Sequence, residues 1–172
     1  LIIANAATIL KKAAAGSPFL VANAWILASY GGLVNAAGRI GTGKYSDVIG
    51  RDNAYTLNCL VSAACLVVLP WIIDSGSVFL LFVAAFIAYW QYGGGLALMP
   101  SYTADFFGPK NLGMNYGLVF LGWGLGFWTT KLGGYIEDAT GSLTYAFWIA
   151  AAILVIAVLL ARVTKRPMHV TE

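Results

Sequence analysis

Apolar segments about as long as a bilayer is thick follow one another along the chain and constrain its fold more than any other feature. They cover residues 18–42, 54–73, 78–99, 112–136 and 143–163, and a shorter apolar run covers residues 1–10. A helix that crosses the hydrocarbon core needs about 20 mostly apolar residues. Backbone polar groups in hydrocarbon must bond within the segment, which favours helices over open strands. The sequence therefore predicts an all-α membrane protein with five full transmembrane helices and the end of a sixth.

Composition supports an integral, multi-pass membrane protein. Hydrophobic residues make up 60% of the chain and charged residues only 10%, whereas soluble domains carry roughly 25% charged residues. The lipid bilayer is thus an expected partner. No basic run interleaved with aromatic residues is present, so nucleic acid is not an expected partner.

The positive residues predict how the helices are oriented. If the connections are numbered alternately, one side of the membrane receives most of the basic residues, namely Arg39, Lys44, Arg51, Lys110, Arg162, Lys165 and Arg166. The other side receives only Lys11 and Lys12. Because basic residues gather on the cytoplasmic side of inner and plasma membranes, we expect a helix bundle over 1–163 and a cytoplasmic tail over 164–172.

The chain carries no set of residues that would make an enzyme. Its one histidine, His169, lies in the polar tail, and no serine has a histidine nearby in the sequence. Cys59 and Cys65 lie in one apolar segment without the spacing of a metal or redox site. We therefore expect no catalytic residue, no metal and no cofactor.

Charges inside the apolar segments are the candidate binding residues. Arg39 lies about one turn inside its segment, and Asn35, four residues earlier, shares its helix face. Lys131 lies within the segment 112–136. Such residues often face a cavity or pathway, but both could also extend to the headgroups, Lys131 toward Glu137 or Asp138. The residues alone leave both alternatives open.

The connection between the segments 18–42 and 54–73 carries a motif. Gly43, Asp47, Gly50 and Arg51 fit the pattern Gly-x-x-x-Asp-x-x-Gly-Arg, which resembles a loop motif of the major facilitator superfamily. The resemblance implies the C-terminal half of a major-facilitator fold, from the end of its seventh helix to its twelfth. It also implies that these four residues form a conformational switch loop, and that an N-terminal helix bundle of the same protein is a partner.

Further stretches resemble the oxalate/formate antiporter family and the related monocarboxylate transporters. They are Leu98 to Gly108, Asn115-Tyr116-Gly117, Gly134-Tyr135 and Asp138 to Ser142. The resemblance implies that Arg39 contacts a substrate carboxylate and that Trp90 faces the substrate. It also suggests roles for Trp123 and Lys131. Asn35 departs from the proton-coupled transporters of animal type, which carry aspartate there, and this puts proton coupling in doubt.

These observations predict a secondary transporter of small organic anions, mono- or dicarboxylates such as oxalate, formate or lactate. Transport would proceed by alternating access, with exchange or ion coupling. The alternative is a non-transporting, facilitator-like helical subunit of a larger membrane complex. The run at 1–10, which begins without methionine, is expected to be the cut end of a helix.

Overall fold

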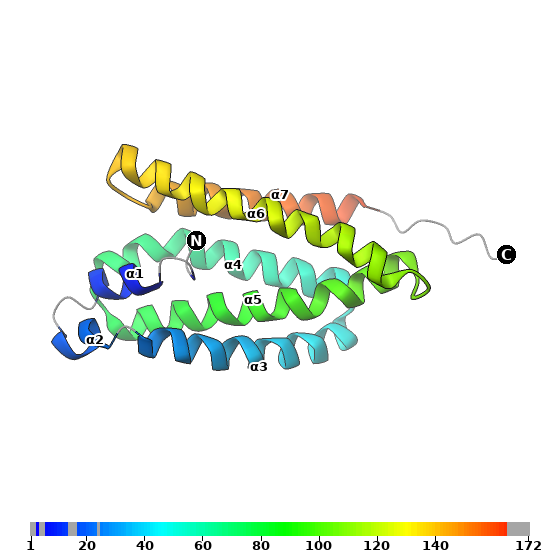
Figure 1. Cartoon of the computed structure of the whole chain (residues 1–172), viewed down its shortest axis with the longest axis horizontal. Coiled ribbons are helices and arrows are strands. Elements are labelled where there is room, and N and C mark those ends of the chain that lie inside the picture. Colours follow the sequence, from blue (N-terminus) through cyan, green and yellow to red (C-terminus); the bar gives the residue numbers. More distant parts are fainter. Residues whose placement is uncertain (1–2, 4–5, 14–16, 24, 165–172) are drawn as a thin grey trace.

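A computed structural model describes residues 3, 6–13, 17–23 and 25–164. The helices are α1 (Ala6–Ala13), α2 (Pro18–Ala22), α3 (Trp25–Ile49), α4 (Arg51–Asp74), α5 (Val78–Phe107), α6 (Leu112–Thr140) and α7 (Thr144–Val163). The five long helices run side by side (Figure 1), and the described part of the chain contains no strand. The predicted all-α membrane bundle is confirmed. The tail from residue 165 onward, with Lys165, Arg166 and His169, lies outside the described residues.

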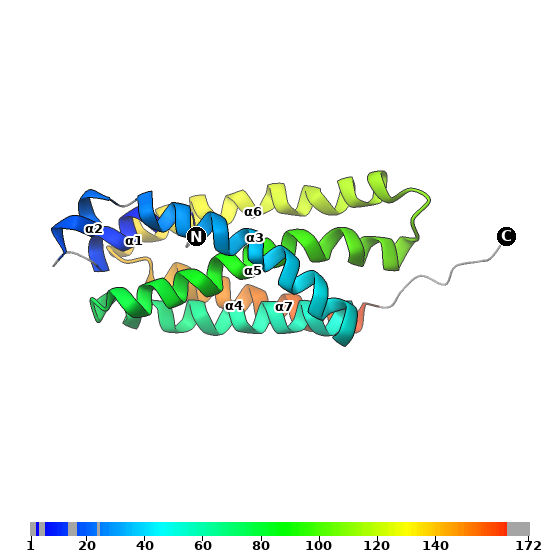
Figure 2. The same ribbon diagram turned by 90° about the horizontal axis from the view of Figure 1, so that it is seen from below.

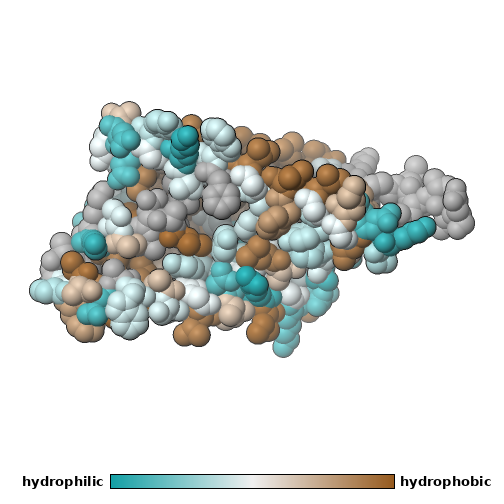
Figure 3. All heavy atoms as spheres, in the orientation of Figure 1, coloured by the Kyte–Doolittle hydropathy of each residue, from teal (hydrophilic) through white to brown (hydrophobic). Residues whose placement is uncertain are grey.

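Three of the described helices, α4, α5 and α7, are long and apolar enough to cross a membrane. Helices α3 and α6 have 25 and 29 residues. At 1.5 Å per residue they reach about 37 and 43 Å, more than the roughly 30 Å of hydrocarbon. Glycine and polar residues dilute their apolar character. They are therefore the two long helices least suited to a surrounding of lipid alone. The apolar surface over α6 and α7 at the upper right of Figure 3 contrasts with the hydrophilic residues that interrupt the lower edge, over α3.

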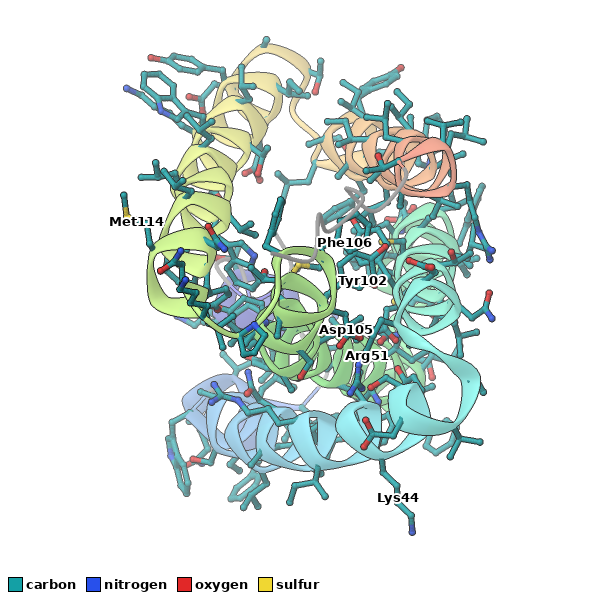
Figure 4. All side chains as sticks on the ribbon, turned by 90° about the vertical axis from the view of Figure 1, so that its right-hand side faces the viewer. Lys44, Arg51, Tyr102, Asp105, Phe106 and Met114 are labelled. Atoms are coloured by element: carbon teal, nitrogen blue, oxygen red, sulfur yellow. The ribbon has the colours of Figure 1, made fainter. Side chains whose placement is uncertain are left out.

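The helices pack in two principal pairs, α3 on α5 and α4 on α7. Seen from below, α3 crosses α5 (Figure 2), and the end-on view places α3 and α6 on different flanks of α5 (Figure 4). Helix α6 is the most loosely packed of the five long helices. Among its residues whose side chains are described, only Gly133 is buried. Residues of α1 also enter the core, where Ile9 and Leu10 are buried.

Two helix boundaries near the start of the chain differ from the prediction. The expected helix 18–42 is divided at Asn23, whose side-chain amide donates to the Phe19 carbonyl oxygen and whose Oδ1 accepts from the Trp25 indole. The Asn23 backbone N–H also donates to the Phe19 carbonyl oxygen, so these side-chain bonds add to the last helical one, as asparagine commonly does at a helix end. The turn expected at 11–17 begins later, because α1 continues to Ala13.

The expected connector 44–53 is also almost entirely helical. Helix α3 continues to Ile49 and α4 begins at Arg51, so only Gly50 separates them. Its φ of +86° is a conformation that glycine adopts without the steric penalty of a side chain. The chain therefore reverses direction at a single residue.

Two other helices end later than expected. Helix α5 passes through Pro100 and ends at Phe107, because a proline within a membrane helix can be accommodated where neighbouring groups compensate for its missing N–H. Helix α6 includes Glu137 and Asp138 and ends at Thr140, where Gly141 takes a φ of +71° and its N–H bonds the Glu137 carbonyl oxygen. This is a common glycine helix end.

Candidate functional site

The close contact between α3 and α5 determines the geometry around Arg39. Glycines lie on both sides of this contact. A Cβ on Gly38 would overlap the backbone of Trp90, and one on Gly93 would overlap the carbonyl oxygen of Asn35. Small residues allow membrane helices to approach backbone to backbone. Asn35 of α3 and Trp90 of α5 are therefore held close to the same glycine contact.

Arg39 is exposed on α3, and its Nε donates a hydrogen bond of 3.3 Å to Oδ1 of Asn35. Within the described residues, no acceptor is paired with the two terminal NH₂ groups. A guanidinium presents its donors as a planar fork that fits a carboxylate through two parallel bonds. Asn35 thus orients the side chain while the terminal donors stay available to an anion.

The surface of α3 around Arg39 differs from the surface beside it. Ala28, Gly32 and Ala36 are exposed on the same side of the helix as Arg39. Leu33 and Ile40 are 76% and 77% exposed, and their positions lie roughly 100° further round the helix. Large apolar side chains suit lipid, whereas small residues suit the approach of another helix. Arg39 therefore lies on the side of α3 that is less suited to lipid.

The other candidate binding residues occupy two places. Trp90 lies in the glycine contact, with its indole ring against Gly41 of α3, and stacks on Phe86, with ring centroids 5.5 Å apart. Trp123 and Lys131 lie on α6, on another flank of α5. The Nζ atom of Lys131 lies 5.4 Å from the ring centroid of Trp128. The structure therefore brings Asn35 and Arg39 together, and it places Trp90 against another side of α3 and Trp123 and Lys131 on α6.

The motif residues meet the end of α5. Arg51 forms an ion pair of 2.5 Å with Asp47 and one of 3.5 Å with Asp105, and it also donates to the hydroxyl of Ser46. The Arg51 side chain is only 18% exposed. Figure 4 shows Arg51 and Asp105 directed toward one another, whereas Lys44 points away from the bundle. We call Ser46, Asp47, Arg51 and Asp105 the connector cluster.

Further hydrogen bonds at this end of the bundle join α4 to α5 and to α7. The Tyr102 hydroxyl of α5 donates to Asp52 of α4. Arg162 of α7 donates to Oδ1 of Asn53 over 3.1 Å. Sequence reasoning missed Tyr102, Asp105 and Arg162 as partners, since each bond joins residues far apart in the chain. The sequence signal that could have indicated the Asp105 pair was an arginine, Arg51, at the start of one helix with carboxylates near the ends of two others.

Sequence reasoning also missed a series of side-chain hydrogen bonds beside the connector cluster. Thr42 donates to the Tyr45 hydroxyl over 3.2 Å, and Tyr45 in turn donates to Oδ1 of Asn58 on α4. Thr42 and Asn58 are buried. A hydrogen bond between buried polar groups avoids the cost of leaving them unpaired. The hydrogen bonds through Tyr45 therefore help to hold α3 against α4. Among the described residues, no group of three or more His, Cys, Asp or Glu could hold a metal ion.

Comparisons with known proteins bear on the whole chain. The family model described as the Major Facilitator Superfamily matches residues 2–172. A relative, the uncharacterized MFS-type transporter YhjX of Escherichia coli K12, is 32% identical over 94 residues. The matched stretch covers 55% of this chain and 23% of YhjX. The match therefore spans less than a quarter of that relative's length.

Proposed function

The chain belongs to the major facilitator superfamily, and from this premise we propose that it serves to carry small organic anions across a membrane. The substrates are mono- or dicarboxylates such as oxalate, formate or lactate. Transport proceeds by alternating access, with exchange or ion coupling as the driving process. A substrate site between two helix bundles is the arrangement that alternating access requires. The small-residue side of α3 would then face an N-terminal bundle of the same protein.

The observation that carries this proposal is Arg39 on the small-residue side of α3. A charge within a membrane helix costs about 2.5–3.5 kcal/mol at the centre on insertion scales, so such residues usually serve a pathway. The arginine fork, held through Nε by Asn35, suits a carboxylate better than a cation or a neutral sugar. Asn35 carries no titratable proton, which supports exchange over proton coupling at this position.

The other candidate residues have supporting roles in the proposal. Lys131 supplies a second positive charge, and Trp90 and Trp123 supply aromatic surface beside the pathway. Gly43, Asp47, Gly50 and Arg51 form the switch loop, whose pairing at the end of α5 biases the balance between conformations. The basic residues at this end support a cytoplasmic location for it and for the tail. If the chain were instead a helical subunit without transport activity, the terminal N–H donors of Arg39 would have no ligand to bind.

Replacing Arg39 by lysine tests the proposal. Arg39→Lys keeps the charge but removes the two-donor fork, and a charge-assisted hydrogen bond is worth about 1.5–3 kcal/mol. We expect kcat/KM for oxalate or formate uptake into proteoliposomes to fall about 10- to 100-fold. The matched control is Arg162→Lys, because Arg162 bonds Asn53 on α4. Normal uptake and affinity in Arg39→Lys would show that Arg39 only anchors the helix.

A further inference from the structure

Two amide side chains inside the bundle each have a buried atom that no described residue pairs with. These atoms are Nδ2 of Asn58 on α4, which is a donor, and Oε1 of Gln91 on α5, which is an acceptor. Asn58 is only 7% exposed and lies in a helix that is long and apolar enough to cross a membrane. Leaving a buried amide unpaired is costly, and hydrocarbon offers it no partner. The two atoms therefore require a partner from outside the described side chains.

The two amides lie on the sides of α4 and α5 that face one another. The Cys65 thiol of α4 donates to the Ala84 carbonyl oxygen of α5 over 3.7 Å, which marks the contact between the two helices. Asn58 is seven residues before Cys65, and Gln91 is seven residues after Ala84. Seven residues are about two helical turns. Each amide therefore returns to the side of its helix that carries this contact.

The two amides also lie at one level along the helices. Figure 1 shows that α4 and α5 run in opposite directions. A step toward the start of α4 and a step toward the end of α5 therefore lead the same way. Two turns correspond to about 10 Å in each helix. Asn58 and Gln91 are thus displaced equally from the Cys65–Ala84 contact, which brings an unpaired donor and an unpaired acceptor to the same level between α4 and α5.

Polar side chains of α3 reach the same region. The Tyr45 hydroxyl donates to Oδ1 of Asn58 and accepts from Thr42. A Cβ on Gly94, three residues beyond Gln91, would overlap the Thr42 hydroxyl. This hydroxyl therefore lies against α5 within one turn of Gln91. Since Thr42 is fully buried, three helices contribute polar groups to one region that is closed to solvent.

We propose that a buried water molecule bridges α4 and α5 at this level, accepting from Nδ2 of Asn58 and donating to Oε1 of Gln91. A water molecule both donates and accepts, so it suits one unpaired group of each kind. A cation would instead meet the N–H of Asn58, and an anion would meet the carbonyl oxygen of Gln91. Buried waters make about three hydrogen bonds, and the Thr42 hydroxyl oxygen is an acceptor for the second hydrogen. The water site is independent of which substrate is carried.

The water bridge extends the hydrogen bonds of Thr42 and Tyr45 from α3 and α4 to α5. A water-mediated bond is nearly as favourable in enthalpy as a direct one. The helix that carries Arg39 is then joined to the helix that carries Trp90 through α4 as well as through their glycine contact. The three helices therefore form one unit within the bundle.

Structures of the intact protein test the water directly. At a resolution that shows ordered water, we expect a density peak about 2.7–3.2 Å from both amide atoms. Replacing Na⁺ by choline in the buffer should leave this peak unchanged. The double variant Asn58→Leu, Gln91→Met removes both amides with little change in volume, and its structure should lack the peak. A direct bond between the two amides, a region without density, or a peak that depends on Na⁺ would overturn the inference.

Thermal unfolding of the variants gives a second test. Asn58→Leu and Gln91→Met each leave the other amide unpaired, so each should lower the midpoint by about 2–8 °C. The double variant removes both amides and should lose less than the two single losses together. The matched control combines Asn58→Leu with Thr129→Val on α6, whose hydroxyl bonds the Gly126 carbonyl oxygen of its own helix. Those two losses should add. Additive losses for Asn58 and Gln91 as well would show that no shared water joins them.

Discussion

At the scale of single residues, the account depends on two cations that lie on different helices. Asn35 orients Arg39 through Nε, and Trp128 lies beneath the ammonium of Lys131. A cation over an aromatic ring gains about 0.5–2 kcal/mol, which holds the Lys131 side chain along α6. Each cation thus has a neutral neighbour that fixes its direction and leaves its charge available to an anion.

Removing the charge of Lys131 tests its role. For Lys131→Gln we expect about tenfold weaker apparent affinity for carboxylates, because one charge-assisted hydrogen bond is lost. The measurement is the KM for uptake into proteoliposomes. Lys110→Gln, in the exposed α5–α6 connection, is the control and should match the parent protein. If Lys131→Gln also kept its KM, Lys131 would be a membrane anchor and Arg39 the sole charged candidate.

At the scale of helices, the contact of α3 with α5 positions the candidate binding residues, and glycine replacements test it. Gly93→Ala places a methyl group on the carbonyl oxygen of Asn35, and overpacking of this kind costs about 1–3 kcal/mol. We expect a lower midpoint of thermal unfolding. We also expect reduced carboxylate affinity, because a displacement of Asn35 also displaces the Arg39 side chain that it orients. Gly126→Ala, on α6, meets nothing within 4 Å and should be neutral or slightly stabilising. Equal behaviour of the two variants would contradict the close helix contact.

The connector cluster makes a different prediction. Asp105→Asn removes the ion pair that joins Arg51 to the end of α5 without altering the side of α3 that carries Arg39. We expect a changed turnover number with a nearly unchanged KM, since the cluster acts on the conformational balance. Asp74→Asn, at the far end of α4, is the control for a lost surface carboxylate. A variant that exchanged one preferred anion for another would place the cluster in the binding site instead.

The five long helices and the fold class were predictable, because the length of the apolar segments decides them in a membrane. The helix ends were not predictable from the apolar pattern. They depend on the side-chain hydrogen bonds of Asn23 and on the backbone angle of Gly50, which that pattern does not reveal. Pro100 was misleading, since a proline is compatible with a continuous helix inside a bundle. The face of Arg39 followed from helical periodicity. The contact of Asn35 with Gly93 did not, because it joins residues distant in sequence.

At the scale of the whole molecule, the described helices divide by composition. The strongly apolar α4 and α7 pack together, while α3 and α6 carry Arg39, Lys131 and most of the unpacked glycines. Lipid suits the first pair, and a second helix bundle with an aqueous pathway suits the other two. The molecule therefore has one side suited to lipid and another suited to packing against further helices.

The most direct test of this account is counterflow with the intact protein in proteoliposomes. Vesicles loaded with unlabelled formate or oxalate are diluted into a trace of the labelled acid. We predict transient accumulation of the label above its equilibrium level, and none in vesicles loaded with chloride or a neutral sugar. The accumulation should be strongly reduced in Arg39→Lys. Absence of accumulation with every carboxylate, or equal accumulation driven by a neutral sugar, would contradict the claim that this chain belongs to a carrier of organic anions.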